Sequence, residues 1–432
     1  MTTPGRQVRA EPDLLTAELD RLLVVADAGL ESGYSGESVR WQPVHTAYVP
    51  AHLFGPKTAT EWGAQALAVL EEFAPGPGEL AQATGLAPGV AEQVHPLVRA
   101  KLASQPVEDL RIDFEDGYGT RADDTEDAHA RAAARSVAAS LRADAAPPLF
   151  GVRCKSLEPA TRARAVRTLF EFLAAVLEHG RPLPGGFVIT LPKVTSAAQV
   201  SAMGVLCEQL EKAFRIEPQR GLVFEIQVET PQVILGADGA ATIARCVHAA
   251  PGRLSGLHFG TYDYSAALGI AGAYQSLDHP AADHAKAVMQ VAAAGTGVQL
   301  SDGSTNVLPV GGRDGVLAGW RLHARLVRRS LERGLYQGWD LHPAQLVSRY
   351  AATYAFYRDA MASAFDRLGR CAARSASGQE EPATIRALAG FVSRAVHCGA
   401  ITEQELTDGT GLTVSDLRYA RRRGIIPTSD PP

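Results

Sequence analysis

The segments FEIQVET (residues 224–230) and LSGLHFGTYDY (residues 254–264) decide the fold. Their apolar runs predict two buried strands, Leu222–Val228 and Leu254–Phe259, and the residues between them favour a helix. Glu229 closes the first strand, and Asp263 follows the second. Because successive parallel strands end at the same edge of a sheet, we expect these acids, 34 residues apart (263 − 229), to converge on one hard cation.

The alternation of strand and helix continues on both sides of this stretch and predicts eight strands in β-then-α order. That count favours an α/β fold of the (β/α)₈ TIM barrel type, with a doubly wound open sheet as the alternative. The expected strands are Val44–Val49, Leu110–Phe114, Pro147–Val152, Phe187–Leu191, Leu222–Val228, Leu254–Phe259, Val298–Leu300 and Leu335–Leu341.

Helical segments flank the expected barrel. Residues 1–42 form an N-terminal extension with one amphipathic candidate helix, and residues 43–368 hold the catalytic barrel. Residues 369–432 hold a polar linker, 373–382, and a small helical appendage. The sequence assigns no role to either flank.

Composition narrows the classes of partner. The net charge of −5 is small for 432 residues and the basic residues are scattered, so we expect a small-molecule partner rather than nucleic acid or membrane. Five widely spaced cysteines with no C-x-x-C pair predict reduced, buried thiols. With no signal-peptide core and no membrane span, a cytoplasmic location is expected.

In a barrel, residues just past the strands form one ring at the carboxyl-terminal mouth. Two carboxylates as the only protein ligands would suit Mg²⁺ or Mn²⁺, although a lone strand-end acid is more often a helix cap or a loop residue. The expected ring comprises Glu115, Asp116, Arg153, Lys193, Glu229 and Asp263.

Several of these residues have alternative roles. Arg153 could hold a substrate carboxylate and an enolate oxygen, or form a buried ion pair with Glu115 or Asp116. Lys193 could form a Schiff base, which a metal site would make redundant. His279 and His342 each precede a proline and are better explained as structural caps.

Six segments resemble, in order, the citrate lyase beta-subunit-like and HpcH/HpaI (hydroxy-oxo-acid) aldolase family. Together they cover about residues 44–346, and the set is more specific than any one segment. They are RIDFEDGYGTR (111–121), GVRCKSLEP (151–159), FVITLPKV (187–194), FEIQVETP (224–231), LHFGTYDYSAALG (257–269) and GWDLHPAQL (338–346).

The resemblance implies a barrel of the phosphoenolpyruvate/pyruvate-binding type and a divalent-metal-dependent carbon–carbon lyase. It makes Glu229 and Asp263 the metal ligands and places Arg153 on the oxo-acid. It also implies that Glu115 and Asp116 organise Arg153 and a catalytic water. The strand-end position of Lys193 predicts that it joins this charged network. The resemblance further implies that the backbone of Gly260, Thr261 and Tyr262 would bind the substrate carboxylate.

The expected reaction passes through a metal-stabilised enolate of a 2-oxo-acid, such as pyruvate or oxaloacetate, or of a hydroxyacyl thioester. A malate-synthase-like condensation and a non-catalytic binding subunit are the alternatives. Relatives of this kind also lead us to expect a homo-oligomer.

Overall fold

The eight predicted strands are all present and form one parallel sheet. The computed structural model describes residues 12–36, 38, 40–178, 182–374 and 381–427. Apolar runs bounded by turns produce short strands that are buried on both faces, as parallel sheets require. The strands are β1 His45–Pro50, β2 Asp109–Asp113, β3 Leu149–Arg153, β4 Phe187–Leu191, β5 Val223–Val228, β6 Leu254–Phe259, β7 Gln299–Ser301 and β8 Gly338–Asp340.

The sheet curves into a barrel, which confirms the predicted fold and excludes the open sheet. The strand order is β7-β6-β5-β4-β3-β2-β1-β8. A single bridge between Ser301 and Gln337 joins the two end strands. Two further backbone hydrogen bonds support this closure, from Asp302 to Gln337 at 2.8 Å and from Trp339 to Gly303 at 3.2 Å. The closure between β7 and β8 is therefore much shorter than the other strand pairings.

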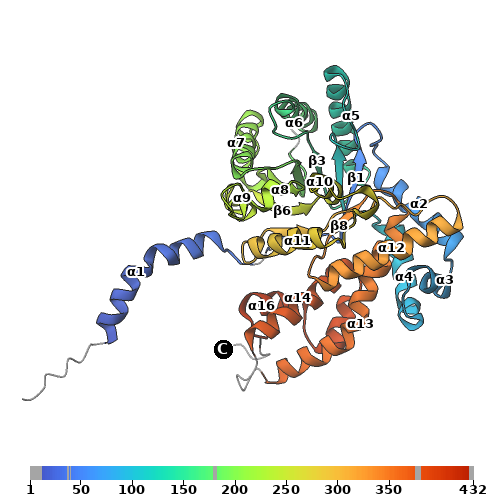
Figure 1. Ribbon diagram of the computed structural model, residues 1–432. Helices are drawn as coiled ribbons and strands as arrows, with labels where there is room; N and C mark the ends of the chain where they lie inside the picture. The colour runs from blue at the N-terminus through green and yellow to red at the C-terminus, as the bar shows by residue number, and fades with distance from the viewer. Residues whose placement is uncertain (1–11, 37, 39, 179–181, 375–380, 428–432) are drawn as a thin grey trace, which may run out of the picture.

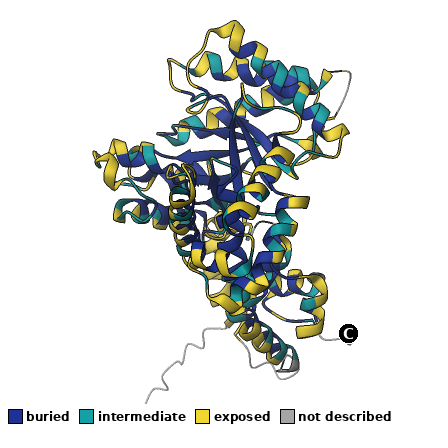
Figure 2. Ribbon diagram, turned by 90° about the vertical axis from the view of Figure 1, so that its right-hand side faces the viewer, coloured by how far each residue is buried: buried dark blue, intermediate teal, exposed yellow. Residues whose placement is uncertain are grey.

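Helices surround the strands, and Figure 2 shows the buried sheet at the centre with exposed residues on the outer helix faces. The helices are α1 Pro12–Gly33, α2 Thr58–Phe73, α3 Pro77–Thr84, α4 Pro88–Ser104, α5 Asp123–Arg142, α6 Arg162–Val176, α7 Ala197–Phe214, α8 Pro231–Ile234, α9 Thr242–Val247, α10 Thr261–Ala267, α11 Pro280–Ala293, α12 Arg313–Glu332, α13 Gln345–Arg374, α14 Pro382–Cys398, α15 Glu403–Thr410 and α16 Val414–Arg423, with 3₁₀ turns at Pro218–Arg220 and Gly272–Tyr274.

The interior of the barrel is polar. Arg111 of β2 donates from Nε and Nη2 to the two carboxylate oxygens of Glu225 on β5, at 2.9 and 2.8 Å, and also contacts Asp109. All three side chains are buried. Because side chains alternate along a strand, the residues two positions further on form the next layer toward the mouth. This ion network therefore lies in the barrel interior below the layer of side chains at the mouth.

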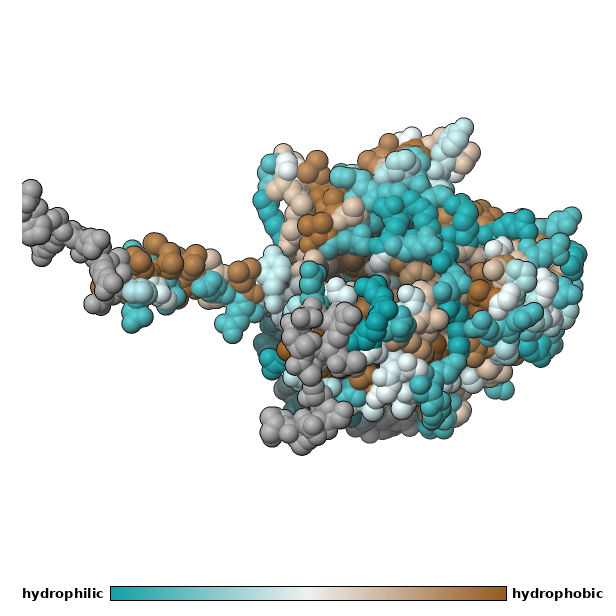
Figure 3. Space-filling model, turned by 90° about the horizontal axis from the view of Figure 1, so that it is seen from below, coloured by the Kyte–Doolittle hydropathy of each residue, from teal (hydrophilic) through white to brown (hydrophobic). Residues whose placement is uncertain are grey.

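Helix α1 projects from the barrel as an isolated arm (Figure 1). None of its side chains is buried, and Leu15, Leu19, Leu22 and Leu30 are each more than half exposed. Figure 3 shows the resulting hydrophobic surface along the arm. The predicted helical extension is therefore present, and it exposes an unpartnered apolar face.

Helices α14 and α15 pack on α13, α16 packs on α14, and α13 in turn packs against α4 and α12. Tyr350 donates to the carbonyl of Pro106 at 2.9 Å, and Tyr354 donates to that of Cys398 at 3.1 Å. Barrel residues and α14–α16 share one apolar core. Residues 375–380 of the expected linker lie outside the described residues. Within the described part of the chain, no helix is long and apolar enough to cross a membrane.

Candidate active site

The two acids singled out from the sequence lie at neighbouring strand ends. Glu229 follows β5 and is buried, whereas Asp263 lies in the first turn of α10, just after β6, and is about half exposed. With Asp116 from the loop after β2, they form a cluster in which one oxygen from each carboxylate lies within 4.8 Å of the others. We call Asp116, Glu229 and Asp263 the carboxylate cluster.

Lys193 places its ammonium group among these acids. Its Nζ lies 3.2 Å from an Asp116 oxygen and 3.7 Å from a Glu229 oxygen, and it also contacts Asp263. Lys193 has a φ of 54°, a left-handed conformation that is uncommon outside glycine. Its backbone N–H donates to Glu229 at 2.7 Å. The strained backbone therefore holds both the amide and the ammonium of Lys193 against the acids.

Arg153, the last residue of β3, is held by Asp113 rather than by the two acids considered in the sequence. Its Nε and Nη2 each donate to Asp113 at 2.6 Å. Its Nη1 makes only longer contacts, 3.3 Å to Glu115 and 3.5 Å to Asp116. The expected ion pair with those acids is thus secondary, and Nη1 is the least saturated nitrogen of the guanidinium.

Burial shifts the protonation of two acids at the mouth. Burial raises the pKa of Glu115 to about 8, against the opposing charge of Arg153. Burial likewise raises the pKa of Glu229 to about 7, with Lys193 opposing the shift and Asp263 adding to it. Both carboxyl groups can therefore carry or release a proton near neutral pH.

The pKa of Lys193 is shifted in the direction that keeps its ammonium group charged. Burial alone would lower its pKa, but Glu229 and Glu115 outweigh burial, so the pKa of Lys193 is raised. A lysine activated as a nucleophile would need the opposite shift. The surroundings of Lys193 thus favour a fixed ammonium.

The Gly-Thr-Tyr turn after β6 brings Asp263 to the cluster. A Cβ on Gly260 would lie 2.5 Å from Glu229 Cβ and 2.6 Å from Glu229 Oε2, so only glycine permits this close approach. Thr261 donates to the carbonyl of Ser304 at 3.1 Å, and Tyr262 donates to Asn306 at 2.8 Å. These three residues adjoin the cluster through the backbone of the turn.

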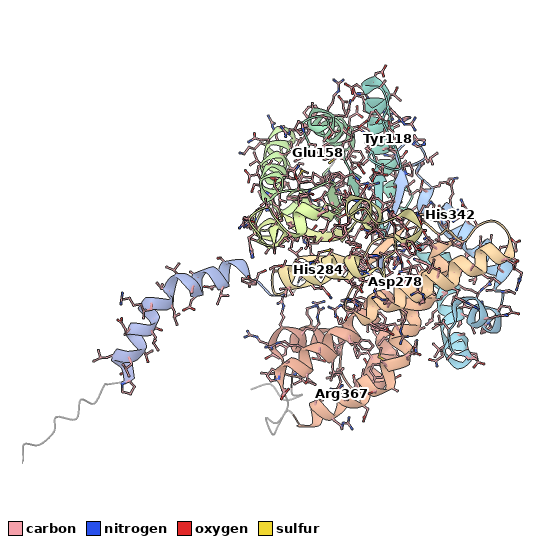
Figure 4. The ribbon with its side chains drawn as sticks, viewed as in Figure 1. Tyr118, Glu158, Asp278, His284, His342 and Arg367 are labelled. Atoms are coloured by element: carbon pink, nitrogen blue, oxygen red, sulfur yellow. The ribbon has the colours of Figure 1, made fainter. Side chains whose placement is uncertain are left out.

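Residues outside the cluster have structural partners. His279 and His342 each accept a backbone N–H through Nδ1, at 3.1 and 3.2 Å, which confirms the predicted capping. Lys155 donates to the carbonyls of Phe114 and Gly119 and so holds the loop after β2. Figure 4 shows Tyr118, from the same loop, far from Arg367 on α13. All five cysteines are buried, as the sequence predicts.

The sequence did not reveal three buried polar residues at or just beneath the mouth: Asp113, Tyr48 and Gln227. The predicted ring lies just past the strands, whereas these side chains lie inside β2, β1 and β5. The signal that would have found two of them is strict alternation of polar and apolar residues, as in DLRID (109–113) and EIQVE (225–229).

The residues present suit a hard divalent cation. The donor set contains only carboxylate oxygens, which Mg²⁺ and Mn²⁺ prefer. Around the mouth, five carboxylates (Asp113, Glu115 and the carboxylate cluster) face two basic groups, those of Arg153 and Lys193. Even with Glu115 protonated, the remaining acids of the mouth outnumber its two basic groups, and this favours binding of a further cation.

The sequence profile of DUF6986, a domain of unknown function, matches residues 23–425. The chain belongs to this family. No curated protein matches the sequence significantly.

Three solved structures are similar to the chain, and one of them superposes well enough to show the shared barrel fold. A citrate lyase from Burkholderia xenovorans LB400 superposes with a TM-score of 0.57 at 18% identity, over 86% of this chain and 96% of that one. A malate synthase from Haloferax volcanii gives 0.47 at 15% identity, over 73% and 76% of the two chains. An HpcH/HpaI aldolase/citrate lyase family protein from Burkholderia cenocepacia J2315 gives 0.39 at 15% identity, over 74% and 94%. At these identities, the citrate lyase likeness shows the fold alone.

Proposed function

We propose that this member of the DUF6986 family is a carbon–carbon lyase or aldolase that acts on a 2-oxo-acid-derived or hydroxyacyl substrate with Mg²⁺ or Mn²⁺. The observation that carries the proposal is the carboxylate cluster at the barrel mouth, next to a buried arginine. Bound Mg²⁺ would supply positive charge where an enolate develops. An enolate is common to cleavage and condensation, so the proposal covers both directions.

Arg153 would stabilise the same charge from the protein side. Asp113 fixes the guanidinium plane through two hydrogen bonds, which leaves Nη1 directed toward Glu115, Asp116 and Gln227. A donor that is already oriented needs no rearrangement when negative charge develops on the substrate oxygen. In this role Arg153 would act on the substrate, and Asp113 would position it.

Glu115 is the candidate proton carrier. With a pKa of about 8, its carboxyl group is mostly protonated at neutral pH, and it lies 3.3 Å from Arg153. A group whose pKa is close to the working pH can both donate and accept a proton during a reaction. Glu115 would therefore exchange a proton with the substrate directly or through one water molecule.

Exchange of the C3 protons of pyruvate with solvent tests the proposal, because it reports enolisation without requiring the second substrate. In D₂O with Mg²⁺, proton NMR should show loss of the methyl signal for wild-type protein. Exchange should stop with EDTA or in Glu229→Gln. Exchange that persists after metal removal, or no exchange with either metal, would overturn the proposal. Borohydride trapping of pyruvate on Lys193 would favour a Schiff-base aldolase instead.

A further inference from the structure

The barrel interior holds several buried polar groups without a partner. Tyr48 Oη, Gln227 Nε2, Trp339 Nε1 and His258 Nδ1 are all buried, and none makes a hydrogen bond with another protein atom. Buried donors are nearly always satisfied, so a group of them in one place requires an explanation. Three of them, on Tyr48, Gln227 and Trp339, are hydrogen-bond donors.

These side chains are neighbours. Tyr48, Arg153 and Gln227 come from β1, β3 and β5, and inward-facing residues of alternate strands share one layer of a barrel. The Arg153 guanidinium lies 5.0 Å from the Tyr48 ring centroid, and Arg153 Nη1 is 3.5 Å from Gln227 Oε1. The ring of Trp339 is centred 4.6 Å from that of Tyr48. The side chains that carry the unsatisfied donors are therefore linked through Arg153 and Tyr48 in one part of the barrel interior.

The donor types indicate what binds there. The Tyr48 hydroxyl, the Gln227 amide and the Trp339 indole all offer hydrogen, and Arg153 Nη1 adds a positively charged donor. A water molecule accepts two hydrogen bonds, whereas a carboxylate has about four acceptor positions on two oxygens. A carboxylate can therefore satisfy the whole group of donors, and a single water cannot.

We propose that Tyr48, Gln227 and Trp339 form a carboxylate-binding subsite beneath the carboxylate cluster. The inference rests on the proposed function and adds a substrate class to it. Gln227 and Glu229 are two residues apart, which is about 6.6 Å along a strand. A substrate held at the mouth would thus place a second carboxylate in the subsite, and dicarboxylic acids would be preferred to monocarboxylic ones.

Binding of succinate, a dicarboxylate that cannot enolise in the manner of pyruvate, tests the subsite. Calorimetry with Mg²⁺ present should show succinate binding more tightly than acetate to wild-type protein. Tyr48→Phe and Trp339→Phe should each weaken succinate binding about tenfold or more, with little change for acetate. Unchanged succinate affinity in both variants would overturn the proposal and leave water as the occupant.

Tyr350→Phe is the matched control, since Tyr350 is also buried but donates to the carbonyl of Pro106. Removing that bonded hydroxyl should lower the Tm and leave succinate binding unchanged. Removing the unsatisfied hydroxyl of Tyr48 should leave the Tm of the ligand-free protein unchanged or higher. An equal fall in Tm for both variants would show that the Tyr48 hydroxyl has a structural partner and would contradict the subsite.

Pyruvate exchange separates this inference from the proposed function. Tyr350→Phe should retain metal-dependent C3 exchange of pyruvate, because Tyr350 lies outside the subsite and donates to the carbonyl of Pro106. If wild-type protein exchanges pyruvate but binds succinate and acetate equally, the subsite is contradicted and the proposed function is not. If the protein binds succinate through Tyr48 but never exchanges pyruvate, the proposed lyase activity is contradicted and the subsite is not.

Discussion

Arg153 donates from Nε and Nη2 to the two carboxylate oxygens of Asp113, at 2.6 Å each, within the barrel mouth. Both side chains are buried, with exposures of 6% and 2%. A buried pair of this kind is costly to break, because the remaining partner keeps an uncompensated charge. The pair therefore links the position of the proposed catalytic arginine to the stability of the fold.

Asp113→Asn should lower the free energy of unfolding by about 3 kcal/mol or more, because it removes the charge that faces Arg153. Urea denaturation measures the change. Glu171→Gln is the control, since Glu171 pairs with Arg131 near the surface, where an ion pair contributes about 1 kcal/mol or less. Equal losses of unfolding free energy in the two variants would show that the buried pair stabilises the fold no more than a surface ion pair does.

Arg153→Lys should lower kcat for the proposed reaction, with the activation free energy raised by roughly 2–4 kcal/mol. A lysine keeps the positive charge but cannot form the two parallel hydrogen bonds of a guanidinium. Pyruvate C3 exchange and the Tm, measured on the same variant, separate catalysis from packing. A variant that melts early yet exchanges pyruvate at the wild-type rate would remove Arg153 from catalysis.

Glu229→Gln and Asp263→Asn should abolish detectable Mg²⁺ binding in calorimetry and leave the fold intact, because both residues lie beyond the strand ends. Asp238→Asn, at an exposed acid in the loop after α8, serves as the control and should bind Mg²⁺ normally. Unchanged binding in either cluster variant would exclude that residue as a ligand.

Lys193→Met should tighten Mn²⁺ binding at least about tenfold, because the ammonium lies among the same oxygens that the cation would use. Lys155→Met removes a nearby positive charge that does not contact the carboxylate cluster, and it should have a much smaller effect. Mn²⁺ titration followed by electron paramagnetic resonance measures both. Equal tightening in the two variants would indicate only a general electrostatic effect.

Mild acid should weaken the attachment of β8 to α12 and α13. Burial lowers the pKa of His323, against its hydrogen bond to Asp340, and Arg349 lowers it further. The folded-state pKa is therefore below the unfolded value of about 6.5, so this contribution to stability is present above pH ~6.5 and lost as the pH falls below it. The Tm should drop between pH 7 and 5, and less steeply in His323→Gln. Parallel pH profiles would exclude His323 as the cause.

We propose that the protein is a homo-oligomer and that α1 contributes to its interface. Because α1 buries no side chain in its own barrel, deletion of residues 1–33 should leave the Tm within about 1 °C of wild type. Light scattering should show that the full chain assembles into an oligomer with more subunits than the truncated chain does. A large fall in Tm, or an unchanged oligomeric state, would contradict this role.

The sequence predicted the strands because their apolar runs are bounded by turns, and it placed Glu229 and Asp263 at strand ends because parallel strands end at one edge. It could not place the Lys193 ammonium, since a left-handed backbone at a non-glycine residue depends on tertiary contacts. It also missed Asp113 as the partner of Arg153. That pairing joins residues of similar position on β2 and β3, and any of three nearby acids was compatible with the pattern.

Because the closure between β7 and β8 is short, we expect the barrel to open locally between these two strands first. Strands β1 and β2 pair over four residues, whereas Ser301 and Gln337 form a single bridge. Local opening costs least where few backbone hydrogen bonds must break. Amide hydrogens around residues 299–303 and 337–340 should therefore exchange with solvent sooner than those of β2–β5. Trp339 lies on this stretch, so transient opening between β7 and β8 would admit water to the barrel interior next to its indole.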